Sequence, residues 1–167
     1  MEIKIRNTSY GTISLTNPIL LNGISTCYKC NKKINVFAFA CKPYNDKSQY
    51  QLPILSYVTK IESTLENAID STRIGKIFFP DYSNTTDSIY YMNHCQYCGA
   101  KRGEFYLHEE PSGAFFIQNE EKLSKLCYFK LNKDPNEIHK FDATIMIEKC
   151  ITSPIFKKEK FLNDFKA

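Results

Sequence analysis

The sequence predicts an α+β fold in which a zinc-ribbon-like β core carries an inserted amphipathic helix and helices near the C-terminus. Two Cys-x-x-Cys pairs, "CYKC" at 27–30 and "CQYC" at 95–98, adjoin segments with the apolar content of strands. The residues between the pairs include apolar side chains at helical spacing. These patterns predict a single zinc-binding domain over residues 1–167, with an inserted helix and loop at about 50–87.

Short apolar stretches predict strands through the first forty residues. "EIKIR" at 2–6 alternates apolar and polar side chains, and "TISLT" at 12–16 and "PILL" at 18–21 are two further short strands. "INVFAFAC" at 34–41 is apolar on both faces apart from Asn35, so it is expected to be a buried central strand.

The middle of the chain changes character. In "LSYVTKIESTLENAI" the apolar residues recur at steps of three and four, which predicts one amphipathic helix over 55–69: Leu55, Val58, Ile61, Leu65 and Ile69. Gly75 is expected to stop it. A polar loop at 80–88 and a strand "IYYMN" at 89–93 lead into the second cysteine pair.

Beyond that pair, "GEFYLHEEPSGAFFI" at 103–117 predicts a β-hairpin around a Pro-Ser-Gly turn. "NEEKLSKLCYF" at 119–129 predicts a helix with Asn119 as its N-cap. "ATIMIEKC" at 143–150 predicts a strand, and "SPIFKKEKFLNDF" at 153–165 predicts a closing helix, with Pro154 at its first position.

The two cysteine pairs together have the composition of a structural zinc site. A turn with two cysteines supplies two sulfur ligands, and a closed tetrahedral Zn²⁺ site needs four. The sequence therefore predicts one structural Zn²⁺ per chain, held by Cys27, Cys30, Cys95 and Cys98. Gly99 and Asn31 each follow the second sulfur of a pair, where such a turn often needs φ > 0. Two unrelated buried pairs, a redox pair and an iron–sulfur cluster remain as alternatives.

The other cysteines and the histidines are not expected to bind the metal. Cys41, Cys127 and Cys150 are expected to be small core residues, with Cys127 on the apolar side of a short helix. His94 precedes Cys95 directly, and neighbouring side chains in a strand point to opposite faces, so it is not expected to ligate.

His108, Glu109 and Glu110 stand together at the predicted hairpin turn. A histidine beside two carboxylates suggests catalysis, but a solvated turn without a defined role is the favoured interpretation. His139 is expected at the surface.

Composition limits the cellular setting and the class of partner. The chain has seven cysteines, no N-terminal signal-peptide core and no long apolar run, which predicts a cytoplasmic protein without a membrane partner. The net charge is +4, and residues 1–50 contribute +5 of positive excess. This balance is too mild for a strong general DNA-binding protein.

The stretch "YYMNHCQYCGAKRGEFYLHEEPSGAFF" resembles a pattern found in small, poorly characterised bacterial proteins with paired Cys-x-x-Cys knuckles. In these the first pair usually precedes a Val- or Phe-rich strand, as in "CYKCNKKINVFAFA" here. The resemblance covers about a third of the chain and implies a zinc-ribbon-like module with a large insertion, ligated by Cys27, Cys30, Cys95 and Cys98. Tyr28 stands where tryptophan is expected, and Glu104 where aspartate is commoner. The resemblance implies no activity.

Three classes of function compete. The first is a non-catalytic protein that binds another protein, such as an immunity or adaptor protein. The second is a nucleic-acid-binding zinc ribbon, because a shared metal site would bring together five cations: Lys29, Lys32, Lys33, Lys101 and Arg102. The third is a zinc enzyme, which four cysteine ligands disfavour because catalytic zinc keeps a position open. The sequence favours the first class and predicts that the protein is not an enzyme.

Overall fold

Strands dominate the computed structural model, which describes residues 8–42, 44–46, 49–131, 134, 136–150, 158–161 and 165. The larger sheet has the order β1-β10-β5-β3-β2-β9-β11, with β4 added to β5. Its strands are β1 (Thr8–Thr16), β2 (Pro18–Thr26), β3 (Lys33–Cys41), β4 (Tyr44–Asp46), β5 (Gln49–Ile61), β9 (Cys127–Lys130), β10 (Ile138–Cys150) and β11 (Lys158–Phe161). Among the described residues, all strand pairs in this sheet are antiparallel except β9 with β11.

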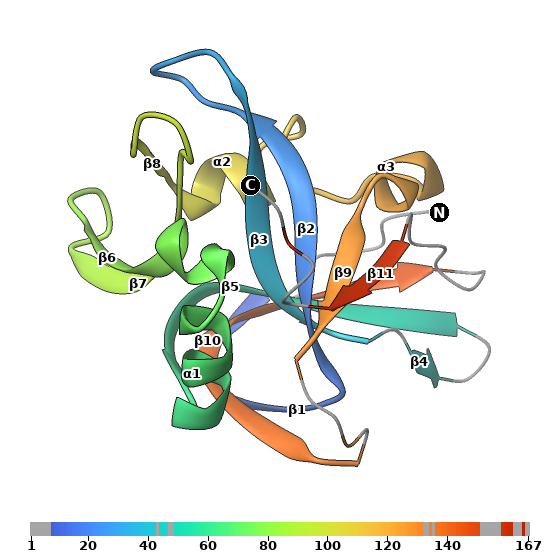
Figure 1. Cartoon of the computed structure of the whole chain (residues 1–167). Coiled ribbons are helices and arrows are strands. Elements are labelled where there is room, and N and C mark those ends of the chain that lie inside the picture. Colours follow the sequence, from blue (N-terminus) through green and yellow to red (C-terminus); the bar gives the residue numbers. More distant parts are fainter. Residues whose placement is uncertain are drawn as a thin grey trace.

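A smaller sheet and a few short helices complete the described fold (Figure 1). The smaller sheet is antiparallel, with the order β6-β7-β8, and consists of β6 (Phe78–Ser83), β7 (Ser88–His94) and β8 (Lys101–Arg102). The helices are α1 (Ser63–Asp70), the 3₁₀ turn η1 (Arg73–Lys76), α2 (Glu104–His108) and α3 (Glu120–Ser124). The fold is thus mostly antiparallel β-sheet, with less helix than the sequence predicts.

The larger sheet coils strongly on itself. β1 is first in the strand order and β2 is fifth, yet only Asn17 separates them in the chain. Asn17 has φ of 49°, which turns the chain sharply, and its carbonyl accepts a hydrogen bond from the Lys42 amide at 3.0 Å. Because β1 and β2 are almost continuous, the sheet has to curve until its first and fifth strands meet.

β3 separates two apolar cores, as expected of a buried central strand. Phe37 and Phe39 point into the first core, which Leu65 and Ile69 of α1 also enter. Val36 belongs to the second core, which the segment between α2 and α3 covers. Successive side chains of a strand face opposite sides, so a strand with a core on each side must be apolar throughout.

The helix predicted over 55–69 is wrong in its first half, and the insertion predicted at about 50–87 begins with a strand of the main sheet. Leu55, Val58 and Ile61 lie in β5, and α1 begins only at Ser63. The pairing of β5 with β10 shifts beside Tyr57, which has φ of 49°. This bulge interrupts the alternation of the strand, so residues three apart all enter the first core and imitate a helical stripe.

The β-hairpin predicted over 103–117 is also wrong. Residues 104–108 form α2, whose buried side chains are Glu104, Leu107 and His108. Those positions follow helical spacing, but two of the three are polar, so the apolar pattern did not reveal them. A Cβ at Gly113 would lie 2.5 Å from the Leu107 carbonyl oxygen, which explains the glycine where the chain turns back against α2.

The two helices predicted near the C-terminus are only partly present. Asn119 caps α3, as predicted, and its side chain accepts a hydrogen bond from the Lys122 amide. The helix is short, however, and Cys127 begins β9 instead of lying on a helix, although it is buried as expected. Residues 158–161, expected in the closing helix, form β11 parallel to β9. The strand predicted at 2–6 and the start of that helix lie outside the described residues.

Candidate metal centre

Two turns of the same geometry carry the four cysteines. The first joins β2 to β3, and the second joins β7 to β8. In the first, the Cys27 amide donates to the Lys32 carbonyl and the Asn31 amide to the Cys27 carbonyl, both at 2.9 Å. In the second, the Cys95 amide donates to the Ala100 carbonyl at 2.8 Å and the Gly99 amide to the Cys95 carbonyl at 2.9 Å. The backbone therefore folds both turns in the same way.

The residue after the second cysteine has positive φ in both turns, as predicted. Asn31 has φ of 61° and Gly99 has φ of 74°. This left-handed conformation reverses the chain behind the two sulfurs and lets both point to the same side. Asparagine and glycine tolerate it better than other residues.

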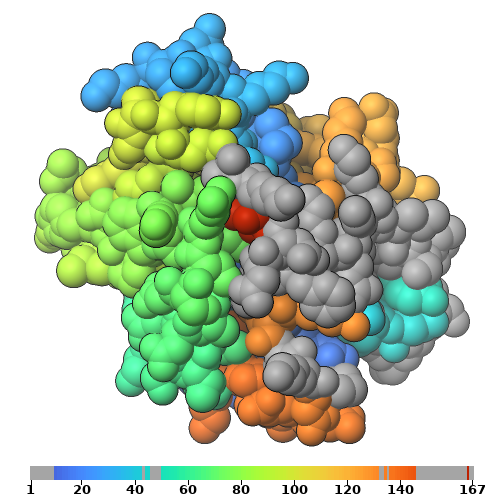
Figure 2. All heavy atoms as spheres, viewed as in Figure 1, coloured from blue at the N-terminus to red at the C-terminus, as the bar shows by residue number. Residues whose placement is uncertain are grey.

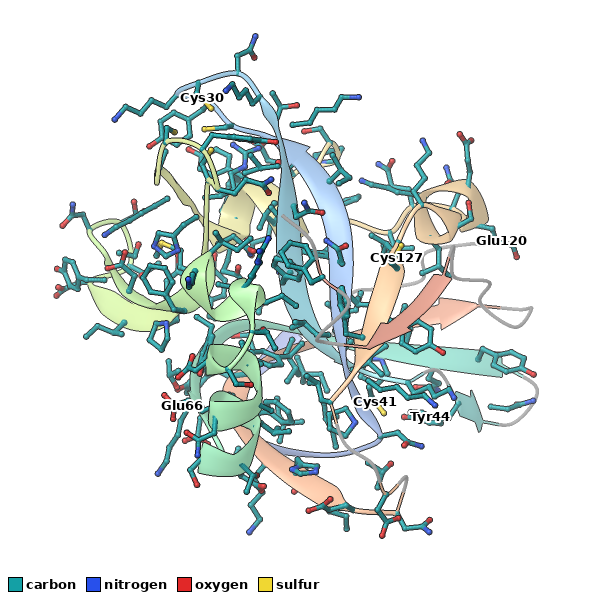
Figure 3. The ribbon with its side chains drawn as sticks, viewed as in Figure 1. Cys30, Cys41, Tyr44, Glu66, Glu120 and Cys127 are labelled. Atoms are coloured by element: carbon teal, nitrogen blue, oxygen red, sulfur yellow. The ribbon has the colours of Figure 1, made fainter. Side chains whose placement is uncertain are left out.

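The four sulfurs come together between the two sheets. The Sγ atoms of Cys27 and Cys98 lie 3.6 Å apart, as do those of Cys30 and Cys95. All four lie within 4.8 Å of one another. In Figure 3 further sulfur atoms lie beside the labelled Cys30, whereas Cys41 and Cys127 lie far from it. Figure 2 shows the two turns in contact at one end of the molecule.

These distances fit a tetrahedral metal ion and do not fit disulfides. A disulfide holds its sulfurs about 2.0 Å apart. An ion with metal–sulfur bonds of about 2.3 Å places tetrahedral sulfurs about 3.8 Å apart. The sulfur positions are compatible with such a centre. Within the described part of the chain, no other group of three or more histidine, cysteine or carboxylate ligand atoms gathers in this way.

Backbone amides in the turns stabilise the thiolate form that ligates metals. A hydrogen bond from the Cys30 amide is the main cause that lowers the pKa of Cys27 to about 6. Burial is the largest single influence on Cys95 and raises its pKa. Hydrogen bonds from the Cys98 and Tyr97 amides, together with those to the Cys98 and Cys30 side chains, bring the net pKa below the usual value. Tyr97 N lies 3.4 Å from the Cys95 sulfur.

Cys30 behaves in the opposite way. The Lys32 amide lowers the pKa of Cys30, but burial and the neighbouring Cys95, Cys27 and Cys98 thiols raise it to about 11. Four adjacent thiols resist complete ionisation because each thiolate repels the next. A bound dication removes this conflict, and its binding releases the remaining protons.

Two side chains that the sequence reasoning missed join β7 and the second turn to β3. Asn93 is fully buried near the end of β7 and binds both backbone polar groups of Phe37. Its Oδ1 accepts a hydrogen bond from the Phe37 amide at 2.7 Å, and its Nδ2 donates one to the Phe37 carbonyl at 2.9 Å. Gln96 Oε1 accepts from the amide of Asn35 at 3.3 Å. A polar residue within an apolar strand, as Asn93 is, suggests a buried hydrogen bond but does not identify its partner.

His94 points away from the sulfur cluster, as the alternation of the strand predicts. Its Nε2 lies 2.8 Å from Asp81 Oδ2, and its ring stacks on Phe79 with centroids 3.9 Å apart. The His94 hydrogen bond is the main cause that lowers the pKa of Asp81. These contacts attach β7 to β6 behind the second turn.

The solvated turn predicted at His108 is wrong. His108 is 1% exposed, and its Nε2 lies 3.1 Å from Glu104 Oε2 on the preceding turn of α2. Glu104 is also buried and accepts a hydrogen bond from the Tyr57 amide at 3.3 Å. Glu104 therefore joins α2, which follows the second cysteine turn, to the bulge of β5. Glu109 is exposed and Glu110 is half-buried.

The surface position predicted for His139 is wrong as well. This side chain is 3% exposed, and its Nδ1 lies 3.0 Å from Glu62 Oε2. It holds β10 against the residue that precedes α1.

The five cations near the cysteines contact different groups of the protein. Lys32 Nζ lies 4.6 Å from the centre of the Tyr97 ring, so it bridges the two turns. Lys101 donates to the Tyr82 carbonyl at 2.7 Å and lies 3.3 Å from Asp81. The Arg102 guanidinium covers the Tyr106 ring. Lys33 lines a groove together with Ile24. Lys29 is exposed.

Comparison of the chain with protein-family models, with curated proteins and with solved structures gives no match. Among the described residues, no helix has the length and apolar content needed to span a membrane.

Proposed function

We propose that Cys27, Cys30, Cys95 and Cys98 hold one structural Zn²⁺ and that the protein acts by binding another protein. The observation that supports the first part is the arrangement of the four sulfurs, which is compatible with a four-cysteine zinc site. Two similar turns at the tips of two hairpins are also the usual elements of a zinc ribbon.

A metal in this site has a structural role. Four thiolates complete its coordination shell and leave no position for a catalytic water. The nearest histidine, His94, is bound to Asp81 on the other side of β7. The metal would join the β2–β3 hairpin of the larger sheet to the β7–β8 hairpin of the smaller one.

Purified protein is expected to contain one zinc per chain. Elemental analysis by mass spectrometry, with protein concentration from amino-acid analysis, measures this ratio. The quadruple replacement of the four cysteines by serine serves as the background control. Less than about half an equivalent, or an excess of iron, would contradict a zinc site.

Exposed aromatic side chains around the two turns support a role in protein binding. Tyr28 is 70% exposed and Tyr97 is 55% exposed, and Phe105 and Tyr106 on α2 are about half exposed. Arg102 covers the Tyr106 ring at 5.2 Å. Tyrosine and arginine are the residues that most often dominate binding energy in protein interfaces. An immunity or adaptor protein would use such a surface without catalysis.

Nucleic-acid binding is the second candidate, because tyrosines and cations also form stacking surfaces. We expect it to be weak. Lys101 and Arg102 are directed into contacts within the protein, and even five phosphate contacts give a log–log salt slope no steeper than about −4.5.

The expected result is negligible affinity for single- and double-stranded oligonucleotides at physiological salt, measured by fluorescence anisotropy. Reversal of Lys32 and Arg102 to glutamate should leave it negligible. Tight binding that survives this salt concentration and is lost in the double variant would make the protein a nucleic-acid reader. Nuclease-sensitive recovery of RNA or DNA in affinity capture would point the same way.

A further inference from the structure

The C-terminal part of β2 has one edge that no described strand pairs with. β9 pairs with β2 only from Ile19 to Asn22, and the last of these pairs is Asn22 with Cys127, the first residue of β9. β2 itself continues to Thr26 and is paired there with β3 alone. Within the described residues, no strand covers the other edge of β2 from Gly23 to Thr26.

The hydrogen-bond pattern shows which groups of β2 face that edge. In an antiparallel pair, the backbone N–H and C=O groups of successive residues alternate: those of one residue point toward the partner strand, and those of the next point away from it. The amide and carbonyl of Phe37 in β3 bind Asn93, and the amide of Asn35 binds Gln96. The backbone groups of Phe37 and Asn35 therefore point away from β2. Phe37 and Asn35 pair with Asn22 and Ile24 of β2. The backbone N–H and C=O groups of Asn22 and Ile24 must therefore point away from β3. The Ile24 amide and carbonyl continue the row through which Asn22 meets β9.

A groove of about 710 Å³ lies along this edge, between β2 and the segment from Pro111 to Leu126 that contains α3. In Figure 1, α3 and β9 stand beside β2 on this side. Ile24 is 56% exposed at the groove, and Ala114 and Leu126 contribute apolar surface. Gly23 allows the close approach, because a Cβ there would lie 3.0 Å from the Ala114 Cβ.

The charge of the groove selects the kind of chain that fits. Lys33 stands on the β2–β3 side, and Lys122 and Lys125 stand on the α3 side. The one acidic residue of the lining is Glu121, and its carboxylate lies 3.6 Å from Lys125 Nζ. The lining therefore carries three positive charges against one negative charge and favours an acidic occupant.

The geometry points to an acidic, extended segment of a partner protein that adds a strand to β2 at Ile24. Its main chain exchanges hydrogen bonds with the Ile24 amide and carbonyl, in line with β9. The side chains of the added strand alternate between its two faces. Its acidic side chains lie on the side of Lys122 and Lys125, and its apolar side chains lie on the other side, against Ile24. This inference rests on the proposed protein-binding function and gives it a place and a partner chemistry. It differs from the aromatic surface around the cysteine turns.

Three blocked peptides of about nine residues, a common strand length, test the inference. One alternates acidic with apolar residues, the second alternates acidic residues with serine, and the third alternates lysine with the same apolar residues. Each is titrated into the full-length ¹⁵N-labelled protein, and amide shifts are followed by NMR. The acidic–apolar peptide alone should shift the amides of Ile24, Thr26, Lys33 and Leu126.

Two pairs of variants separate strand addition from binding in the groove by charge alone. Ile24→Pro removes the outward amide without breaking a hydrogen bond to β3, and should weaken peptide binding at least about tenfold. Ile24→Val keeps that amide and should stay within about twofold of the unaltered protein. Lys33→Glu with Lys125→Glu should weaken binding, whereas Lys60→Glu, placed elsewhere on the surface, should not.

The inference is overturned if the acidic–apolar peptide causes no groove shifts at about 1 mM, or if the basic peptide binds equally. It is also overturned if Ile24→Pro and Ile24→Val bind alike, which would indicate a small amphipathic anion instead of an added strand. Zinc content is measured on the same samples. Zinc-loaded protein that ignores the peptides refutes the groove alone, and protein without zinc refutes the proposed metal site whatever the peptides do.

Discussion

Replacement of Cys95 by serine is expected to lower the melting temperature by more than about 10 °C, because the proposed zinc site loses one of its four ligands. Zinc binding to four cysteines supplies on the order of 10 kcal/mol, which is comparable to the whole stability of a small domain. Cys95 is 3% exposed and packs in the second core, so water cannot replace the lost ligand without disrupting that core.

Cys127→Ser is the matched control for this variant. Cys127 is also buried, but it lies in β9 and takes no part in the sulfur cluster. Its replacement loses packing only and is expected to cost about 1–2 kcal/mol. Differential scanning calorimetry with and without a chelator completes the comparison. A chelator should lower the melting temperature of the unaltered protein and of Cys127→Ser, and should change Cys95→Ser little. Equal losses in the two variants would show that the four cysteines have no special role in stability.

Asn93→Leu is expected to destabilise the protein by about 2–5 kcal/mol, since it leaves two buried backbone groups of Phe37 without partners. Leucine has nearly the shape of asparagine, so the packing changes little. Phe37 and Asn93 are both 0% exposed, and no water can reach the freed amide and carbonyl. Urea unfolding followed by circular dichroism measures the loss.

Gln96→Ala is the control, because Gln96 makes a similar contact with the Asn35 amide at a half-buried place. Water can take over that contact, so the expected cost is below about 1 kcal/mol. If Asn93→Leu cost no more than Gln96→Ala, Asn93 would not be the residue that holds the two sheets together.

The cluster of four cysteines was the most predictable part of this protein from its sequence. The spacing of two cysteines indicates their geometry as ligands, because the turn that directs both sulfurs to one side is formed within six residues. The positive φ at Asn31 and Gly99 followed from the same local argument and is confirmed. Asn93 and Gln96 were missed because their partners, Phe37 and Asn35, lie more than fifty residues away and no local pattern reports them.

The predicted helices and hairpin failed where tertiary contacts override the local pattern. The bulge at Tyr57 gave β5 the apolar spacing of a helix, and two buried polar residues gave α2 no apolar stripe. The strand β11 pairs in parallel with β9, which is distant in the chain. A partner of this kind cannot be inferred from the residues of the strand itself. The strand β3 was predicted correctly because its residues are apolar on both faces and it is buried on both.

The position of the cysteine turns also determines where this fold accepts additional chain. A metal ion bound by both turns would close the sixty-four residues from Asn31 to His94 into a loop. Closure entropy grows only with the logarithm of loop length, so an insertion of about twenty residues would cost about 0.2 kcal/mol. The exposed turn at 84–87, between β6 and β7, lies inside that loop and outside both cores. Proteins built in the same way are therefore expected to differ widely in the number of residues between their two cysteine pairs. Each pair is expected to keep its Cys-x-x-Cys spacing.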